Sequence, residues 1–483
     1  MPEAFTSEQL EDIQGFGIAG FNKDHQELLF VRVGDPVGGR RLLSWLQSRT
    51  ASAWEVGTFN QLFKEIKGRT NNEPLAVTWI AVLISAAGYQ ALGISTSGLP
   101  AGDGTAAFNG GMASRAPNIG DTGPLDVPTS WLTPFRPGEG VHLCIVAAAD
   151  EPDDLDEAVT TIGEQISACN CEVVYQERGE TLPSPFVGHE HFGFKDGISQ
   201  PAIDGYDVTP LPNEPPVAPP GEFVLGYPSA SGPATQLNGN LWTNGSFAVF
   251  RRLHQNVAAF RNQAAAGVPG SSPLLTADQS AAALVGRWPS GAPLEINPIS
   301  DPGPTSISNA FGYKASLFND DDGHVCPRFA HIRKANPRDE STPSPADDPA
   351  QHRMIRRGIP FGPLLPPGIT DDGTDRGLHF FCVVSDVVRQ FEFIQSSWLN
   401  QANFPSGQAG PTPGTYSPPS QRPPDGPDPV VGEGTTGRSC LLVQASGDHA
   451  FPITAQFVNV TAGEYFFVPS LTALSELASG ISQ

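Results

Sequence analysis

Asp196 is the first residue whose setting suggests chemistry. It stands between two glycines in the sequence GFKDG, residues 193–197. Glycine adopts backbone conformations that other residues avoid, so this spacing is typical of a tight turn that can lie against a flat ligand. A carboxylate in such a turn can act as a general acid or base. The alternative is a surface turn in which Asp196 only binds its own backbone.

A histidine followed by a basic cluster is the second candidate. His331 stands in FAHIRKANPR, residues 329–338, where apolar residues precede it and Arg333, Lys334 and Arg338 follow. A neutral imidazole is a strong ligand of iron, and nearby cations can pair with ligand carboxylates such as the propionates of haem. The alternatives are a hydrogen-bonded structural histidine and a solvated basic surface.

Two adjacent arginines form the third candidate. Arg356 and Arg357 stand in MIRRGIPFGP, residues 354–363. We expect them to run into an apolar turn of glycine and proline, with one guanidinium pointing inward and its neighbour facing solvent. A buried arginine needs an anionic partner, and the negative charge that develops on a bound peroxide would serve. The alternative is an arginine that holds a loop through carbonyl groups.

The hydrophobic pattern predicts the elements that position these residues, as repeated strand–helix–strand units. The first half predicts strands over residues 26–33, 75–85, 142–149 and 171–175, and helices over 7–14, 38–47 and 155–168. The second half predicts strands over 245–253 and 378–385, a helix over 257–266 and a helical stretch through Phe391, Ile394 and Trp398. Two similar modules follow, residues 1–210 and 211–483, divided at a proline-rich connection.

The charge of the chain excludes some classes of partner. There are 28 basic and 51 acidic residues, a net charge of −23, and such a surface repels phosphate backbones and anionic lipids. We therefore expect neither nucleic acid nor a membrane as a partner. The six cysteines are too few for a disulfide framework, so we expect most of them to be free and buried.

The three candidate segments together resemble one family, the dye-decolorizing peroxidases, and most of all its fungal members. The shared motifs are GxxDG at 193–197, the histidine of HIRKANPR and the arginine of IRRGIPFGP, in the family's order. LEDIQG at 10–15, GEFVLGYP at 221–228 and GEYFFVPSLTAL at 463–474 extend the resemblance over nearly the whole chain. It implies an α+β fold of two ferredoxin-like modules with antiparallel sheets, related to the chlorite dismutases, that enclose one haem b.

The resemblance also implies a role for each candidate. His331 would be the axial ligand of the haem iron, while Asp196 and Arg356 would be catalytic residues on the opposite, peroxide-binding face. Asp196 would take a proton from the peroxide and return it to the leaving oxygen, and Arg356 would stabilise negative charge. Asp428 resembles the family's carboxylate that hydrogen-bonds the proximal histidine and makes the imidazole more electron-donating.

Several further positions follow from the same resemblance. Trp398 is similar to the surface tryptophan that carries electrons from bulky dyes, and a core tryptophan on a helix is the alternative. Phe361 stands where some fungal members have a redox-active tyrosine, so we expect no tyrosyl route there. The residues expected to bind the haem or to line its pocket are Ile198, Gln200, Arg333, Phe381 and Val383.

The implied activity is that of a haem peroxidase that uses hydrogen peroxide to oxidise dyes, phenols and aromatic amines in one-electron steps, with Mn(II) as a further candidate reductant. The alternatives are a haem-binding or storage protein and a haem-free acidic binding module in which Asp196 and His331 are only structural. The N-terminus shows no signal peptide. We expect an extracellular location if the chain is a processed form, as in many fungal relatives, and a cytoplasmic one otherwise.

Overall fold

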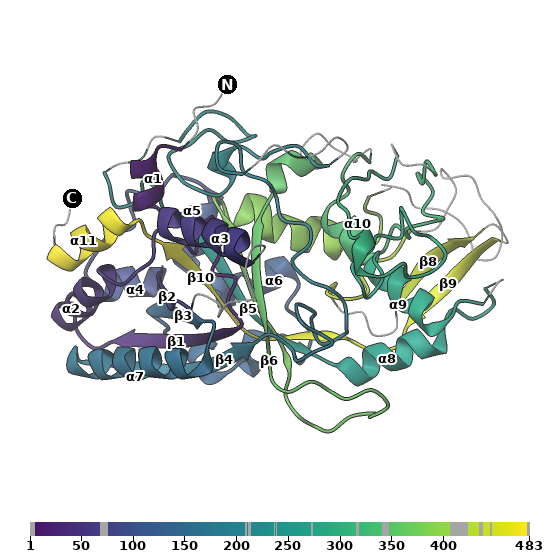
Figure 1. Cartoon of the computed structure of the whole chain (residues 1–483), viewed down its shortest axis with the longest axis horizontal. Helices are drawn as coiled ribbons and strands as arrows, with labels where there is room; N and C mark the ends of the chain where they lie inside the picture. The colour runs from purple at the N-terminus through teal and green to yellow at the C-terminus, as the bar shows by residue number, and fades with distance from the viewer. Residues whose placement is uncertain are drawn as a thin grey trace.

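A computed structural model describes most of the 483 residues (Figure 1). The described ranges are 5–67, 76–207, 210, 214–235, 237, 239–271, 274–314, 318–340, 347–405, 424–433, 438–444 and 447–480. Residue 75 of a predicted strand and residues 211–213 of the predicted connection lie outside them. No helix in these ranges is long and apolar enough to cross a bilayer.

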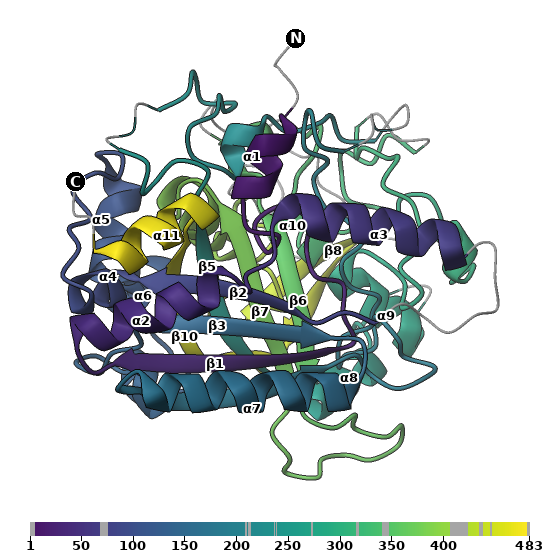
Figure 2. The same cartoon turned by 60° about the vertical axis from the view of Figure 1, so that its left-hand side comes forward.

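Four antiparallel strands form the N-terminal half of the main sheet: β1 (His25–Val33), β2 (Trp79–Ser85), β3 (Leu143–Ala149) and β4 (Cys171–Glu180), in the order β4-β1-β3-β2. The helix α7 (Pro152–Ala168) runs along β1 and covers this half from outside (Figure 2). Its buried residues recur on one face because apolar positions are spaced at the helical period: Leu155, Ile162 and Ile166.

The C-terminal half repeats the same arrangement. Its strands are β5 (Ser246–Gln255), β6 (Ile355–Phe361), β7 (Gly377–Val384) and β10 (Val458–Val468), in the order β10-β5-β7-β6. Counted within each half, both sets follow the order 4-1-3-2, which is that of the ferredoxin-like fold. The sequence-based prediction of two ferredoxin-like antiparallel modules is confirmed.

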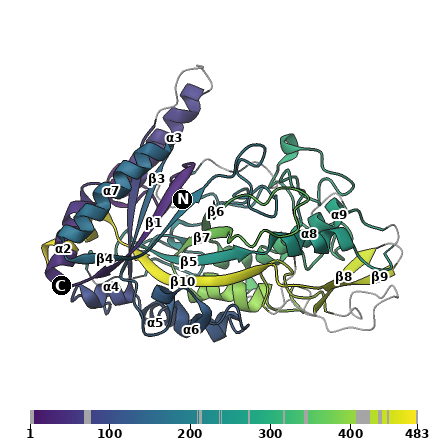
Figure 3. The same ribbon diagram turned by 90° about the horizontal axis from the view of Figure 1, so that it is seen from below.

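The remaining elements surround this sheet. The helices are α1 (Ser7–Asp12), α2 (Pro36–Gln47), α3 (Ala53–Lys67), α4 (Ala86–Ala91), α5 (Asp103–Gly110), α6 (Met112–Ile119), α8 (Val257–Ala266), α9 (Ala277–Val285), α10 (His331–Ala335) and α11 (Leu471–Ser479). A separate hairpin pairs β8 (Arg438–Gln444) with β9 (Gly447–Ile453), far from α2 and α7 in Figure 3. Short 3-10 helices occur at Pro128–Ser130, Thr133–Phe135, Pro220–Glu222, Pro304–Ser306 and Pro349–His352.

The two halves share one sheet and one core. The last strand of the N-terminal half, β2, pairs with β10 of the C-terminal half, where Ser85 lies opposite Phe466. Inside the sheet the ring of Phe30 on β1 lies 5.0 Å from that of Phe250 on β5. The helix α11, from the end of the chain, packs on α2. A division at residue 210 therefore stays a prediction, because the sheet and the core continue across it.

The outer strands β4 and β6 meet and close the sheet on itself. At this contact a Cβ on Gly179 of β4 would lie 2.5 Å from Cγ2 of Ile359 on β6. Glu177 of β4 accepts hydrogen bonds from Arg252 on β5 and His379 on β7, each at 2.7 Å. Burial alone would raise the pKa of Glu177, but these two partners lower it to about 2. The closure thus combines close backbone approach with a buried ion pair.

Two local predictions from the sequence differ from the structure. The arginines of residues 354–363, expected to run into a Gly/Pro turn, lie instead on the strand β6, which tolerates Pro360 because β6 comes last in the hydrogen-bonded order of the sheet and pairs on one side only. The helical stretch near Trp398 consists of two π-type segments, Val388–Glu392 and Ile394–Leu399. All six cysteines are buried and free, as expected.

The β4–β6 contact predicts a local intolerance of side chains. Gly179→Ala should lower the free energy of unfolding by about 1–3 kcal/mol, because the new methyl group overlaps Ile359 and pushes the strands apart. Gly163→Ala on α7 is the matched control, since its Cβ would meet nothing within 4 Å and alanine favours a helix. Chemical denaturation of both variants checks this; equal stabilities would contradict it.

Candidate functional site

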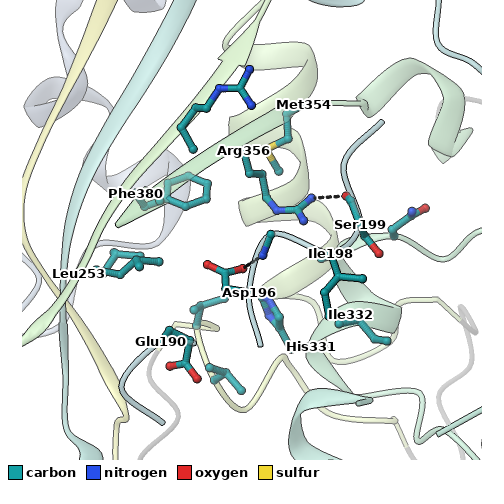
Figure 4. A pocket seen from close by; sticks show the side chains of 18 of the residues that line it. Glu190, Asp196, Ile198, Ser199, Leu253, His331, Ile332, Met354, Arg356 and Phe380 are labelled. Atoms are coloured by element: carbon teal, nitrogen blue, oxygen red, sulfur yellow. Dashed lines mark hydrogen bonds between the residues drawn. The ribbon is translucent and has the colours of Figure 1, made fainter. Parts of the chain in front are cut away.

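A cavity of about 660 Å³ lies on the C-terminal half of the sheet. Alternate residues of β5 form part of its wall, namely Arg251, Leu253 and Gln255, together with Leu378 and Phe380 of β7. Because side chains alternate along a strand, one face of the sheet supplies this wall. Figure 4 shows the cavity with His331 below Asp196 and Arg356. The structure therefore brings together the three residues that the sequence singled out.

His331 is held by a buried carboxylate. It is the first residue of α10, and its Nδ1 lies 2.7 Å from Oδ2 of Asp428, whose side chain is fully buried. The other oxygen of Asp428 accepts hydrogen bonds from the backbone N–H groups of Val430 and Val431, at 2.7 and 3.0 Å. Burial lowers the pKa of His331, but Asp428 outweighs it and raises the pKa overall. This pairing of Nδ1 leaves Nε2 as the nitrogen that can bind a metal.

The loop of Asp196 is fixed by a second, half-buried carboxylate. Gly193 and Gly197 have φ angles of +98° and +73°, which explains the two glycines of the motif. Glu190 accepts hydrogen bonds from the N–H groups of Phe192 (2.8 Å) and Phe194 (2.9 Å), and burial raises its pKa to about 7. Among the residues that the structure describes, the Asp196 carboxylate is bonded only by the N–H of Gly197, at 2.6 Å, so one of its oxygens is available to a ligand.

Arg356 is locked to the same loop. Its Nη1 donates to the carbonyl of Ser199 at 3.0 Å. The amide of Gln200 binds the backbone of Arg356 twice, accepting from its N–H at 3.0 Å and donating to its carbonyl at 2.6 Å. Ile198 also lines the cavity, as predicted, and so does Gln200. These bonds fix the position of Arg356 relative to Asp196 although the two are far apart in sequence.

Arg333 does not line the cavity, and its prediction as a haem-binding residue is wrong. Its fully buried guanidinium binds Asp320 at 2.9 Å and Glu340 at 2.5 and 3.1 Å, and stacks 4.3 Å from the ring of Tyr313. The basic cluster after His331 predicted cations that pair with the carboxylates of a ligand. The charge of Arg333 is instead neutralised by the protein's own carboxylates, Asp320 and Glu340. Arg333 is therefore a structural residue.

Phe381 and Val383 were predicted to line the pocket, and this prediction is wrong by one residue of register. Phe381 packs in the core, 5.4 Å from the ring of Phe16 and 4.9 Å from that of Phe250, and Val383 is also fully buried. Leu378 and Phe380 face the cavity instead. A continuous apolar strand such as LHFFCVV does not reveal which face meets a ligand.

Trp398 is not at the surface. It is 1% exposed, lines the cavity, and stacks on Phe404 with ring centres 5.1 Å apart. His352 lies against it at 5.1 Å. Of the two alternatives for Trp398, the structure agrees with the core tryptophan on a helical segment, while any role in electron transfer stays a prediction.

Three other arginines line the cavity, of which the sequence analysis named only Arg338, as part of the basic cluster after His331. Arg287, Arg338 and Arg353 form no ion pair with any residue in the described ranges, and burial lowers the pKa of each. Arg338 donates to the carbonyls of Asn309 (2.9 Å) and Phe311 (2.8 Å). Arg338 is the last cation of the basic cluster that also contains Arg333. The sequence showed the cluster, but it did not show which of its cations lines the cavity.

Arg357 also departs from its prediction. It is only partly exposed and lines another part of the cavity, and its buried Nε has no hydrogen-bond partner among the residues described. Its side chain leaves β6 on the opposite face from Arg356, because neighbouring residues of a strand alternate. The two adjacent arginines therefore serve two different parts of one cavity.

The fold is an α+β barrel made of two ferredoxin-like units. A large cavity in which charged side chains converge is typical of an enzyme's active site. A family model described as the DyP dimeric alpha+beta barrel domain matches residues 12–183. The chain is 34% identical over 441 residues to the dye-decolorizing peroxidase of Mycena epipterygia, over 85% of this chain and 77% of that one. It is 32% identical to a dye-decolorizing peroxidase of Auricularia auricula-judae, over 98% and 87% of the two chains.

Solved structures agree with these relatives. An ancestral D-type dye-decolorizing peroxidase superimposes with a TM-score of 0.81 at 30% identity, covering 97% of this chain and 99% of that one. A dye-decolorizing peroxidase in complex with 2,6-dimethoxyphenol gives a TM-score of 0.76 at 28% identity, with coverage of 97% and 99%. This chain belongs to the dye-decolorizing peroxidase family.

The reassignment of Arg333 predicts a stability effect. Arg333→Leu should lower the free energy of unfolding of the haem-free protein by about 3–5 kcal/mol, because Asp320 and Glu340 would remain buried without their cation. The control Arg49→Leu removes an exposed arginine and should change it by about 1 kcal/mol or less. Urea denaturation measures both. An Arg333→Leu protein as stable as the control would show that the network is not structural.

Proposed function

We propose that this chain is a haem b peroxidase that uses hydrogen peroxide to oxidise dyes, phenols and aromatic amines. The observation that carries this is the arrangement around the cavity, with the His331–Asp428 pair on one wall and the Asp196–Arg356 pair on another. Membership of the family supports the activity, and the phenol complex of a related structure supports the class of reductant.

The residues present fit a haem group. His331 would bind the iron through Nε2, and Asp428 would fix the ring and make it more electron-donating. Apolar side chains that line the cavity, such as Leu253 and Phe380, suit a flat porphyrin. The propionates would pair with the cations Arg338 and Arg353, which have no carboxylate partner among the residues described.

Bound haem would supply the redox centre that accepts two electrons one at a time. Asp196 would take a proton from the attacking peroxide oxygen and deliver it to the departing one, and Arg356 would stabilise the negative charge on the breaking O–O bond. The overall balance is one H2O2 and two phenols giving two water molecules and two phenoxyl radicals. Gln200 and Ser199 keep Arg356 in place without taking part in proton transfer.

Other assignments remain part of this proposal. Trp398, at the cavity wall, would carry electrons between the haem and donors outside, with His352 and Phe404 as its ring contacts. Mn(II) stays a prediction; the part of the chain that the structure describes contains no group of three or more His, Cys, Asp or Glu residues arranged to hold a metal ion. A haem-storage role is less well supported, because it leaves the Asp196–Arg356 pair unexplained.

Reconstitution with haemin tests the cofactor and its ligand. The protein should give a Soret band, and His331→Ala should lose or shift it because the nitrogen ligand is gone. Absorption spectra of both proteins make the measurement. A wild-type protein without a Soret band, or a band that His331→Ala leaves unchanged, would overturn the assignment.

The peroxide step tests the two catalytic residues. With haem bound and no donor present, Asp196→Asn should slow the spectral change on adding peroxide by about 10²–10⁴-fold, since the proton carrier is lost. Arg356→Leu should slow it by about 10²–10³-fold, since charge is no longer stabilised. Stopped-flow absorption measures the rates, with the exposed Asp154→Asn as control. Unchanged rates in both variants would mean that other residues do this work.

A further inference from the structure

The cavity continues around the edge strand β6 to a second region beyond the Asp196–Arg356 pair. Arg356 and Gly358 line it on one face of β6, and Arg357 and Ile359 on the other. Residues near the N-terminus, including Phe16 and Phe21, line this second region. The region is therefore continuous with the proposed haem site but is built partly by the N-terminal module.

Arg357 is the exceptional charge in this region. Its Nη2 donates to the carbonyl of Ile18 at 3.0 Å, its Nε is buried without a partner, and no ion pair joins it to any described carboxylate. Burial lowers its pKa to about 10, although Tyr206 and Asp207 act in the opposite direction. A half-buried guanidinium without an anionic partner among the residues described favours an anionic ligand beside it.

The backbone is shaped to hold this guanidinium flat. Gly20 has a φ of +74°, and a Cβ at this position would lie 2.7 Å from Cζ of Arg357. A glycine is therefore required for the guanidinium to lie against the chain. The other nearby cation, Lys23, is already paired with Asp150. Arg357 is left as the cation available to a ligand.

Aromatic rings stand next to this cation. Phe16 and Phe21 meet edge to face with ring centres 6.0 Å apart, and Phe16 is braced from behind by Phe381. Phe16 and Phe21 are 3% and 6% exposed, so the edges of their rings border the cavity beside the guanidinium N–H donors of Arg357, which suit a carboxylate. Glu214 is an acidic residue that also lines the cavity, and it favours one localised anionic group over a multiply charged ligand.

We propose that Arg357, Phe16 and Phe21 form a subsite for small phenolic carboxylates, which act as reductants of this peroxidase. The carboxylate binds Arg357, and the ring contacts the edges of the two phenylalanines within the cavity that also contains the proposed haem site. The inference rests on the proposed function, because the donor gives one electron and one proton per molecule to the peroxide-oxidised enzyme and leaves as a phenoxyl radical.

The test compares two donors of nearly the same shape, 4-hydroxybenzoate and neutral 4-hydroxybenzamide, with the haem-loaded protein. Arg357→Gln should raise KM for 4-hydroxybenzoate about tenfold or more, because charge-assisted hydrogen bonds are lost, and leave kcat unchanged. KM for 4-hydroxybenzamide should stay within twofold. Arg357→Lys keeps the charge but not the fork and should give an intermediate KM. The control Arg49→Gln removes an exposed charge and should alter neither donor.

Binding gives a readout that needs no turnover. Calorimetry with benzoate, which lacks the phenol group, should show a dissociation constant about tenfold higher for Arg357→Gln than for the wild type. Equal changes for the charged and neutral donors, or benzoate binding that ignores Arg357, would overturn the subsite. The reaction with peroxide in the absence of a donor tests the proposed function separately. Arg357→Gln should react at the wild-type rate. If the wild-type protein does not react with peroxide, the peroxidase proposal itself fails.

Discussion

The hydrogen bond between Nδ1 of His331 and the buried carboxylate of Asp428 is the constraint on which the site depends. It joins residues 97 positions apart in sequence and fixes which imidazole nitrogen faces the cavity. The carboxylate is itself held by two backbone N–H groups, so neither the ring nor its partner is free to turn. The opposing wall is fixed in the same way, by Glu190 under the Asp196 loop and by Gln200 on Arg356.

Charge is distributed unevenly in this acidic chain. The net charge is −23, yet the arginines Arg287, Arg338, Arg353, Arg356 and Arg357 line one cavity, and none of them forms an ion pair with a described residue. A cavity lined in this way attracts anions despite the acidic surface. Propionates, the charge developing on peroxide and, in our proposal, a donor carboxylate would each meet a different member of this set.

Sheet closure explains how a site can use both modules. Because β2 pairs with β10 and β4 meets β6, the GxxDG loop that follows β4 reaches the wall formed by β6 and β7. The same closure sets Phe16 and Phe21 beside Arg357. The sequence motifs come from separate segments, and only the common sheet makes them neighbours.

The sequence by itself determined six of the strands (β1 to β5 and β7), the helix over Val257–Ala266 and the free cysteines, because hydrophobic periodicity is a local property. It also singled out Asp196, His331 and Arg356, through motifs that resemble those of one family. Tertiary structure alone decided that Phe380 rather than Phe381 faces the cavity, since both faces of β7 are apolar. It also decided that Arg333 binds Asp320 and Glu340 while Arg338 and Arg357 meet the cavity. A cation's partner depends on loops that fold against it, and no local pattern encodes that choice.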